Sequence, residues 1–125
     1  MDKFWALLEE RLALCYKALL LRHHLLEGTL VESSPLHWRF GGIARLERGA
    51  TIDKLLHDGF STISLGYIGI YETVYSLIGV SHTTPEGKDL AFKIMNRLAD
   101  ACVQWKEQTG LGFGLYGTPR QTWAA

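Results

Sequence analysis

Apolar residues recur every three or four positions near the start of the chain, which predicts a long helix over residues 3–27. Gly28 follows it as a stop signal. Additional leucines widen the apolar face beyond one stripe, so we expect this helix to be covered on more than one side. The stripe and the added positions are Trp5, Leu8, Leu12, Cys15, Leu19 and Leu26, with Leu7, Leu14, Leu20, Leu21 and Leu25.

A second helical pattern begins at Thr83 and ends at Gly110. Thr83 and Glu86 have the spacing of a capping box, and Pro85 stands where a missing N–H costs little. The apolar stripe of this helix comprises Leu90, Ala91, Ile94, Met95, Leu98, Cys102 and Trp105.

Two short segments have the character of strands. Residues 60–66 are β-forming and mostly apolar on both faces, as in a covered sheet, and residues 111–116 form a second candidate. Residues 68–78 between them look helical. A crossover connection favours a parallel pair, although two intervening helices leave antiparallel or non-adjacent strands open. The pattern predicts an α/β, helix-dominated fold.

Residues 29–50 are predicted to be irregular because serine, proline and glycine interrupt them. Thr51 then caps a short helix that runs to about His57, and Gly59 ends it. Four apolar positions predict that the irregular segment is packed: Leu36, Trp38, Phe40 and Ile43.

The balance of charges argues against partners that are bound through a strong net charge. In this chain of 125 residues, 13 Lys and Arg offset 13 Asp and Glu, so we expect neither nucleic acid nor a membrane as partner. The apolar run over residues 13–21 is too short and interrupted to span a bilayer. Two cysteines without a Cys-x-x-Cys pair give no disulfide framework and no structural zinc motif. We expect a cytoplasmic location.

The isolated cysteines and histidines give little support for a catalytic or metal-binding site. Cys15 and Cys102 fall on apolar helix faces, where packing is favoured over a nucleophile or radical carrier. His23 and His24 are adjacent on a helix and diverge by about 100°, so we do not expect them to share a metal ion. The other histidines lie in or near loops without an i, i+4 partner, and no metal site is predicted: His37, His57 and His82.

Two features near the strand ends are candidates for a site. Glu72 follows the Gly66–Gly69 bend by one turn and lies near any site at the strand end; the alternative is a solvent-facing helix residue. Residues 112–119 are rich in glycine, and N–H groups of such a loop attract phosphate before a helix start. Their spacing matches neither a P-loop nor a dinucleotide fingerprint, so a plain turn remains open.

Three ordered blocks resemble one known family: residues 61–72 (STISLGYIGIYE), 82–88 (HTTPEGK) and 115–119 (LYGTP). Residues 4–16, 22–23 and 44–46 are similar to the same family. Together they resemble the large chain of anaerobic (class III) ribonucleoside-triphosphate reductases. The likeness covers residues 1–119, a predicted catalytic-barrel segment, and residues 120–125 are predicted to be a divergent tail.

The resemblance implies part of a ten-stranded glycyl-radical-type α/β barrel. In that family a glycyl radical oxidises a cysteine on a loop inside the barrel, the thiyl radical abstracts a ribose hydrogen, and formate supplies electrons. Zinc on four cysteines, ATP and deoxynucleotide effectors and a radical-SAM activase complete the system. In this chain the strand-to-helix turn at Tyr116, Gly117 and Thr118 would bind nucleotide phosphate.

The chain departs from the family by omission, because it has no Met-Gly-Cys-Arg-type loop, no glycyl-radical motif, no zinc-binding cysteine set and no ATP cone. We therefore expect a reductase fragment without catalytic residues or a cofactor of its own, inactive alone, and partnered by the remainder of the barrel. The alternatives are a non-catalytic remnant that binds itself or another chain, and an unrelated small α/β binding domain.

Overall fold

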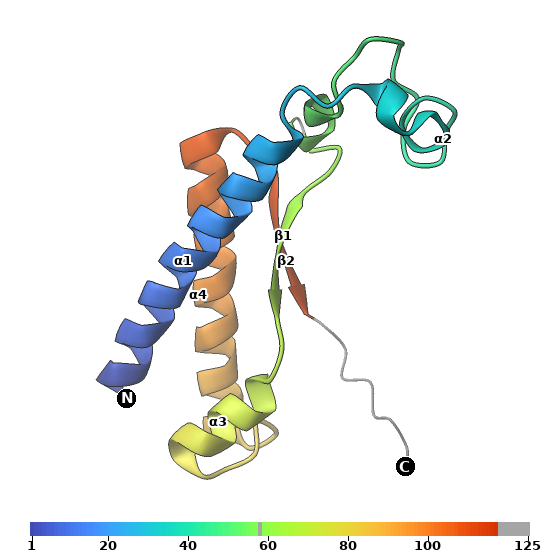
Figure 1. Ribbon diagram of the computed structural model, residues 1–125. Helices are drawn as coiled ribbons and strands as arrows, with labels where there is room; N and C mark the ends of the chain where they lie inside the picture. Colours follow the sequence, from blue (N-terminus) through green and yellow to red (C-terminus); the bar gives the residue numbers. More distant parts are fainter. Residues whose placement is uncertain (58, 118–125) are drawn as a thin grey trace, which may run out of the picture.

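Two long helices and a pair of short strands dominate the structure, a computed structural model that describes residues 1–57 and 59–117 (Figure 1). The predicted order of helices and strands is confirmed, except that two short helical turns lie within residues 29–50, which were predicted to be irregular. Thr118 and the predicted tail over residues 120–125 lie outside the described residues. In chain order the elements are α1 (Asp2–Leu26), η1 (Val31–Ser33), α2 (Pro35–Trp38), η2 (Ile52–Leu56), β1 (Ile63–Tyr67), α3 (Ile70–Ile78), α4 (Pro85–Thr109) and β2 (Phe113–Gly117).

Helix α1 matches the predicted N-terminal helix closely. Gly28 follows it with a φ of 78°, a left-handed conformation that glycine adopts without steric cost. Leu12 and His23 are buried, whereas four leucines are 47% to 75% exposed: Leu7, Leu14, Leu21 and Leu25. The expected cover on more than one side is therefore missing among the described residues. No helix in the described parts of the chain is both long and apolar enough to cross a bilayer.

Helix α4 begins one residue later than predicted. Thr84, rather than Thr83, is the N-cap, and its hydroxyl accepts a hydrogen bond of 3.1 Å from the Gly87 N–H. The capping pattern missed this because the two threonines are adjacent. Pro85 takes the first helical position, and Gly110 ends the helix with a φ of 73°, both as predicted.

The strands form a parallel pair, with Ile63 opposite Phe113 and Tyr67 opposite Gly117. The chain crosses from β1 to β2 through α3 and α4, so the favoured parallel arrangement is confirmed. Strand β1 starts later than predicted, and Phe60, expected in the strand, is 62% exposed.

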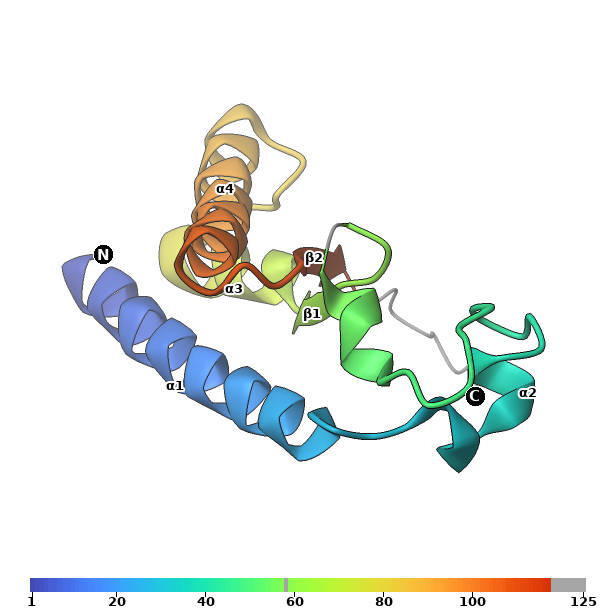
Figure 2. The same ribbon diagram turned by 90° about the horizontal axis from the view of Figure 1, so that it is seen from above.

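Helices cover only one face of the strand pair (Figure 2). Leu65 and Phe113 point into the core, whereas Ser64, Gly66 and Tyr116 are exposed on the opposite face. Within the described structure, the prediction of a sheet covered on both faces is wrong. The many apolar residues over positions 60–66 suggested two buried faces. Phe60, however, lies outside the strand, and within β1 buried and exposed side chains alternate.

The core is built on α4. Tyr16 of α1 stacks on Trp105 with 5.2 Å between ring centroids, and Trp105 meets Phe113 of β2 edge-on at 5.5 Å. These rings join both long helices to the sheet. The predicted apolar stripe supplies six buried residues, Leu90, Ala91, Ile94, Leu98, Cys102 and Trp105. Met95 of that stripe is half-buried, and the buried Ala101 was not part of it.

The segment that contains η1 and α2 stands apart from the strand pair (Figures 1 and 2). Val31 and Ala44 are its buried apolar residues. Backbone hydrogen bonds, such as the one from the Gly42 N–H to the Leu36 C=O, hold this segment together, and a hydrophobic core contributes little. The predicted packing is therefore wrong at three positions, which are 74%, 62% and 55% exposed: Leu36, Phe40 and Ile43.

Candidate functional site

The carboxyl ends of both strands meet at one edge of the sheet, because the strands are parallel and Tyr67 is level with Gly117. Ligands bind at this edge in open α/β sheets. The predicted site residues Tyr116 and Gly117 end β2 there, whereas Thr118 lies outside the described residues. The prediction of a nucleotide site thus falls on the edge where a ligand is expected.

Gly117 packs closely against a tyrosine side chain. A Cβ atom at this position would lie 2.8 Å from the Tyr67 hydroxyl oxygen, closer than real Cβ contacts. The tyrosine ring of β1 therefore lies directly against the backbone at the end of β2. The adjacent Tyr116 side chain is 55% exposed on the face that no helix covers.

A cavity of about 430 Å³ opens beside this edge, at the joint between β1 and α3. The ring of His82, from the loop before α4, meets that of Tyr71 edge-on with 5.4 Å between centroids. The cavity therefore combines rings from two segments with the backbone of the strand–helix joint. Its lining residues are Tyr67, Ile68, Gly69, Ile70, Tyr71, Glu72 and His82.

Glu72 is both exposed and part of this cavity, so the structure fits each of the two roles considered for it. Its Oε2 atom lies 3.7 Å from where a Cβ on Gly69, the N-cap of α3, would stand. A carboxylate there complements the positive end of the helix dipole. The same carboxylate repels a second anion, so the start of α3 is a poor phosphate site.

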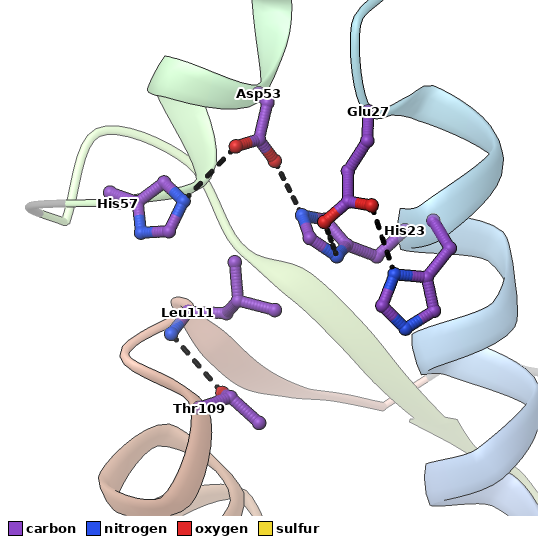
Figure 3. A network of polar contacts seen from close by, with 7 residues as sticks. His23, Glu27, Asp53, His57, Thr109 and Leu111 are labelled. Carbon is purple, nitrogen blue, oxygen red and sulfur yellow. Dashed lines mark hydrogen bonds and ion pairs between the residues drawn. The ribbon is translucent and has the colours of Figure 1, made fainter.

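A cluster of polar side chains lies at the other end of the strand pair, where α1 ends and η2 begins (Figure 3). Asp53 joins two imidazoles: Oδ1 is hydrogen-bonded to His23 Nε2, and Oδ2 lies 3.2 Å from His57 Nε2. On the far side of the His23 ring, Nδ1 faces Glu27 Oε1 at 3.8 Å. Asp53 lies in the predicted short helix, which is 3₁₀ and receives no side-chain cap from Thr51.

This cluster corrects two sequence predictions. The His23, Asp53 and His57 ligand atoms lie within 4.8 Å of one another, and so do those of His23, His24 and Glu27. The prediction that His57 lacks an i, i+4 partner is therefore wrong, because the carboxylate of Asp53 is that partner. His23 and His24 are also close enough to share an ion with Glu27, despite being adjacent on α1.

Opposing effects act on the Asp53 carboxyl. Burial disfavours the charged form and is the largest effect, yet the hydrogen bonds and charges of His23 and His57 together outweigh it. The pKa of Asp53 is consequently lowered. The carboxylate thus remains ionised and serves as an acceptor for both rings.

The two cysteines lie on the long helices α1 and α4, and they differ in burial. Cys102 is buried in α4, and burial raises the pKa of its thiol, which favours the unreactive protonated form. Cys15 is exposed on α1, so its predicted place on a buried apolar face is wrong.

A family model described as anaerobic ribonucleoside-triphosphate reductase matches residues 1–125. The chain belongs to this family. The predicted resemblance is therefore confirmed over the blocks on which it was based.

Curated relatives in this family carry the name anaerobic ribonucleoside-triphosphate reductase. The Escherichia coli K12 protein is 42% identical over 122 residues, which are 94% of this chain and 17% of that protein. The Salmonella typhimurium protein is 40% identical over 121 residues, with the same two shares. The phage T4 protein is 34% identical over 121 residues, 96% of this chain and 18% of its own. No solved structure matches.

The chain thus spans less than a fifth of the reductases that it matches. Its kinship to a segment of the large reductase chain, predicted from the sequence, is confirmed. The four-cysteine zinc site that the family implies does not fit these residues, because the chain has only two cysteines, one exposed and one buried.

Proposed function

We propose that this chain forms two neighbouring wall strands of the reductase barrel, which in the complete enzyme reduces ribonucleoside triphosphates. The parallel pairing of β1 and β2 supports this, because barrel strands are parallel and joined by helical crossovers. Helices on one face only fit the same arrangement, in which helices lie outside and the bare face looks inward.

The residues on the bare face suit a barrel interior that must hold a substrate. Ser64 and Gly66 on β1 and Gly114 on β2 are small, and they leave space beside the single large ring of Tyr116. We infer that this space accommodates the ribose and the cysteine loop of the complete enzyme. Tyr116 is the side chain on this face that can stack on a base or sugar.

We place the nucleotide phosphates at the carboxyl end of β2, at Tyr116 and Gly117, together with Thr118, the third residue predicted from the sequence. The support is that backbone N–H groups at the end of a strand attract anions. The start of α3 is the competing location, but the Glu72 carboxylate disfavours a phosphate there.

The radical chemistry itself is assigned to other parts of the enzyme. Hydrogen abstraction from ribose needs a radical carrier, and these 125 residues contain neither the Met-Gly-Cys-Arg-type loop nor the glycyl-radical motif. The proposal therefore gives this chain scaffolding and substrate positioning. The glycyl radical, formate, nucleotide effectors and the radical-SAM activase act on the complete enzyme.

The exposed leucines of α1 mark the contact with the remainder of the barrel. They recur at positions 7, 14 and 21, one heptad apart, and therefore lie along one side of the helix. The same row would serve self-association, the alternative function. A concentration-dependent dimer in sedimentation that Leu14→Glu abolishes would favour that alternative.

Nucleotide binding tests the proposed site. Equilibrium dialysis of the chain against radiolabelled ribonucleoside triphosphate should show binding that Tyr116→Ala weakens about tenfold, since stacking on a base is worth roughly 1–3 kcal/mol. Gly117→Ala should weaken it by displacing Tyr67. Phe40→Ala, an exposed ring in the segment apart from the strands, is the matched control. Equal affinities in all four proteins would refute the site.

A further inference from the structure

We propose that His23, Asp53 and His57 bind a divalent transition-metal ion of the zinc class at the junction of α1 and η2. This site is separate from the proposed nucleotide edge. It lies at the amino end of the strand pair, beside Thr109 and Leu111 just before β2. It also differs from the cysteine-bound zinc of the family in its ligand type, imidazole and carboxylate in place of thiolate.

The donor set and its spacing suit such an ion. Two imidazoles and one carboxylate are ligands typical of Zn²⁺ and its neighbours. With bonds of about 2.0–2.2 Å, a tetrahedral ion places its ligand atoms about 3.3–3.6 Å apart. His57 Nε2 lies 3.2 Å from Asp53 Oδ2, and all three donor atoms lie within 4.8 Å of one another. The direct hydrogen bond between His23 and Asp53 has to open for an ion to enter between them, and side-chain rotation can then close the three donors around it.

An independent observation comes from the buried ring of His23. This side chain is only 6% exposed, and its Nδ1 atom has no hydrogen-bond partner. Nδ1 lies 3.8 Å from Glu27 Oε1, too far for a hydrogen bond. A buried polar atom left in this way is costly.

A metal ion would use both nitrogens of this ring. A ligating histidine usually donates its other ring N–H to a carboxylate, which fixes the tautomer. Glu27 lies on that side of the ring, and a small side-chain rotation would bring its Oε1, now 3.8 Å from Nδ1, within hydrogen-bond distance. Without a metal, Nε2–H donates to the Asp53 carboxylate; a bound ion would take the place of that proton, and the ring proton would move to Nδ1.

The open side of the cluster has room for the remaining ligand. A cavity of about 370 Å³ adjoins the three donors. His57 and Asp53 have side chains that are 40% and 25% exposed, so an ion can enter from solvent. Three protein ligands with one open position are typical of zinc sites that keep a bound water. Here the ion would also tie α1 to a segment 30 residues away in sequence.

Metal titration tests the site. After treatment with chelator, the chain should bind one Zn²⁺ per molecule in calorimetry, and Zn²⁺ should raise its melting temperature. Asp53→Asn and His57→Gln should each weaken binding at least tenfold. His37 is an exposed histidine outside the cluster, so His37→Gln is the matched control. This variant should bind Zn²⁺ as tightly as the parent chain.

Two further measurements separate the alternatives. Circular dichroism of each variant checks that lost binding does not reflect lost folding, and Co²⁺ absorption in the folded His57→Gln protein should lose its tetrahedral bands. His24→Gln should leave binding unchanged. The proposal is wrong if the parent chain binds no Zn²⁺, if His24→Gln removes binding while His57→Gln does not, or if His37→Gln weakens it equally.

Discussion

At the scale of single residues, burial decides which side chains can react. Cys102 sits among the core residues of α4, and the raised pKa of its thiol follows from that burial. Cys15 projects from the outer side of α1. The two cysteines of this chain are therefore expected to differ in the reactivity of their thiols.

Thiol labelling should reveal this difference. In the native chain a maleimide should modify one thiol, Cys15, and in denaturant it should modify both. Cys15→Ser should reduce native labelling to nearly zero, as measured by intact mass. Rapid native modification of Cys102 would contradict the packing described for α4.

A second residue-scale effect is the ion pair between the long helices. Arg97 Nη2 donates to Glu9 Oε2 at 2.6 Å, and this hydrogen bonding, partly opposed by desolvation, lowers the pKa of Glu9 below its usual 4.5. A depressed carboxyl pKa contributes stability above the unfolded-state value, and that stability is lost as pH falls through the folded-state value. Glu9→Gln should therefore flatten the fall in unfolding free energy below about pH 4.5.

Urea titrations at several pH values measure this slope. Glu10→Gln is the matched control, because Glu10 pairs with its neighbour Arg11 and not with Arg97. Identical pH slopes in the parent and the Glu9→Gln protein would show that the pair does not form in solution.

At the scale of elements, the sequence patterns correctly predicted the helices, because helix starts and stops depend on interactions between residues close in the sequence. The spacing of leucines in α1 and the Pro85 and Gly110 signals in α4 fixed both long helices to within a residue or two. Contacts between distant segments were not predictable in this way. The His23–Asp53 hydrogen bond joins residues 30 apart in the sequence, and the 74% exposure of Leu36 reflects the absence of a distant segment packed on it in the described structure.

Gly87 in the first turn of α4 supports a prediction at this scale. Replacing a helical glycine by alanine normally stabilises a protein by about 1 kcal/mol. Here the added Cβ would lie 2.1 Å from the Ser81 carbonyl oxygen, a backbone atom that cannot rotate away. Gly87→Ala should instead destabilise the chain by roughly 1–3 kcal/mol in urea unfolding.

Lys88→Ala, at the exposed position next along the same turn, serves as the comparison and should change stability little. A Gly87→Ala protein at least as stable as the parent would mean that the loop before α4 does not take the described path.

At the scale of the whole molecule, the described structure has one well-covered face and one bare face. The core lies between α4 and the strand pair, while the far face of the sheet and the leucine row of α1 are exposed. The chain matches under a fifth of its relatives' length, and in the proposed function the remainder of the reductase covers these exposed surfaces. The proposed scaffold role depends on that fit.

The most direct test transplants the chain into a complete reductase. In the Escherichia coli K12 protein, which is 42% identical over the shared segment, residues of this chain would replace the matching stretch. The chimera, activated anaerobically and supplied with formate, should form its glycyl radical and produce deoxyribonucleotide at a measurable rate, and Tyr116→Ala should reduce that rate. A folded chimera that carries the radical but makes no deoxyribonucleotide would contradict the account.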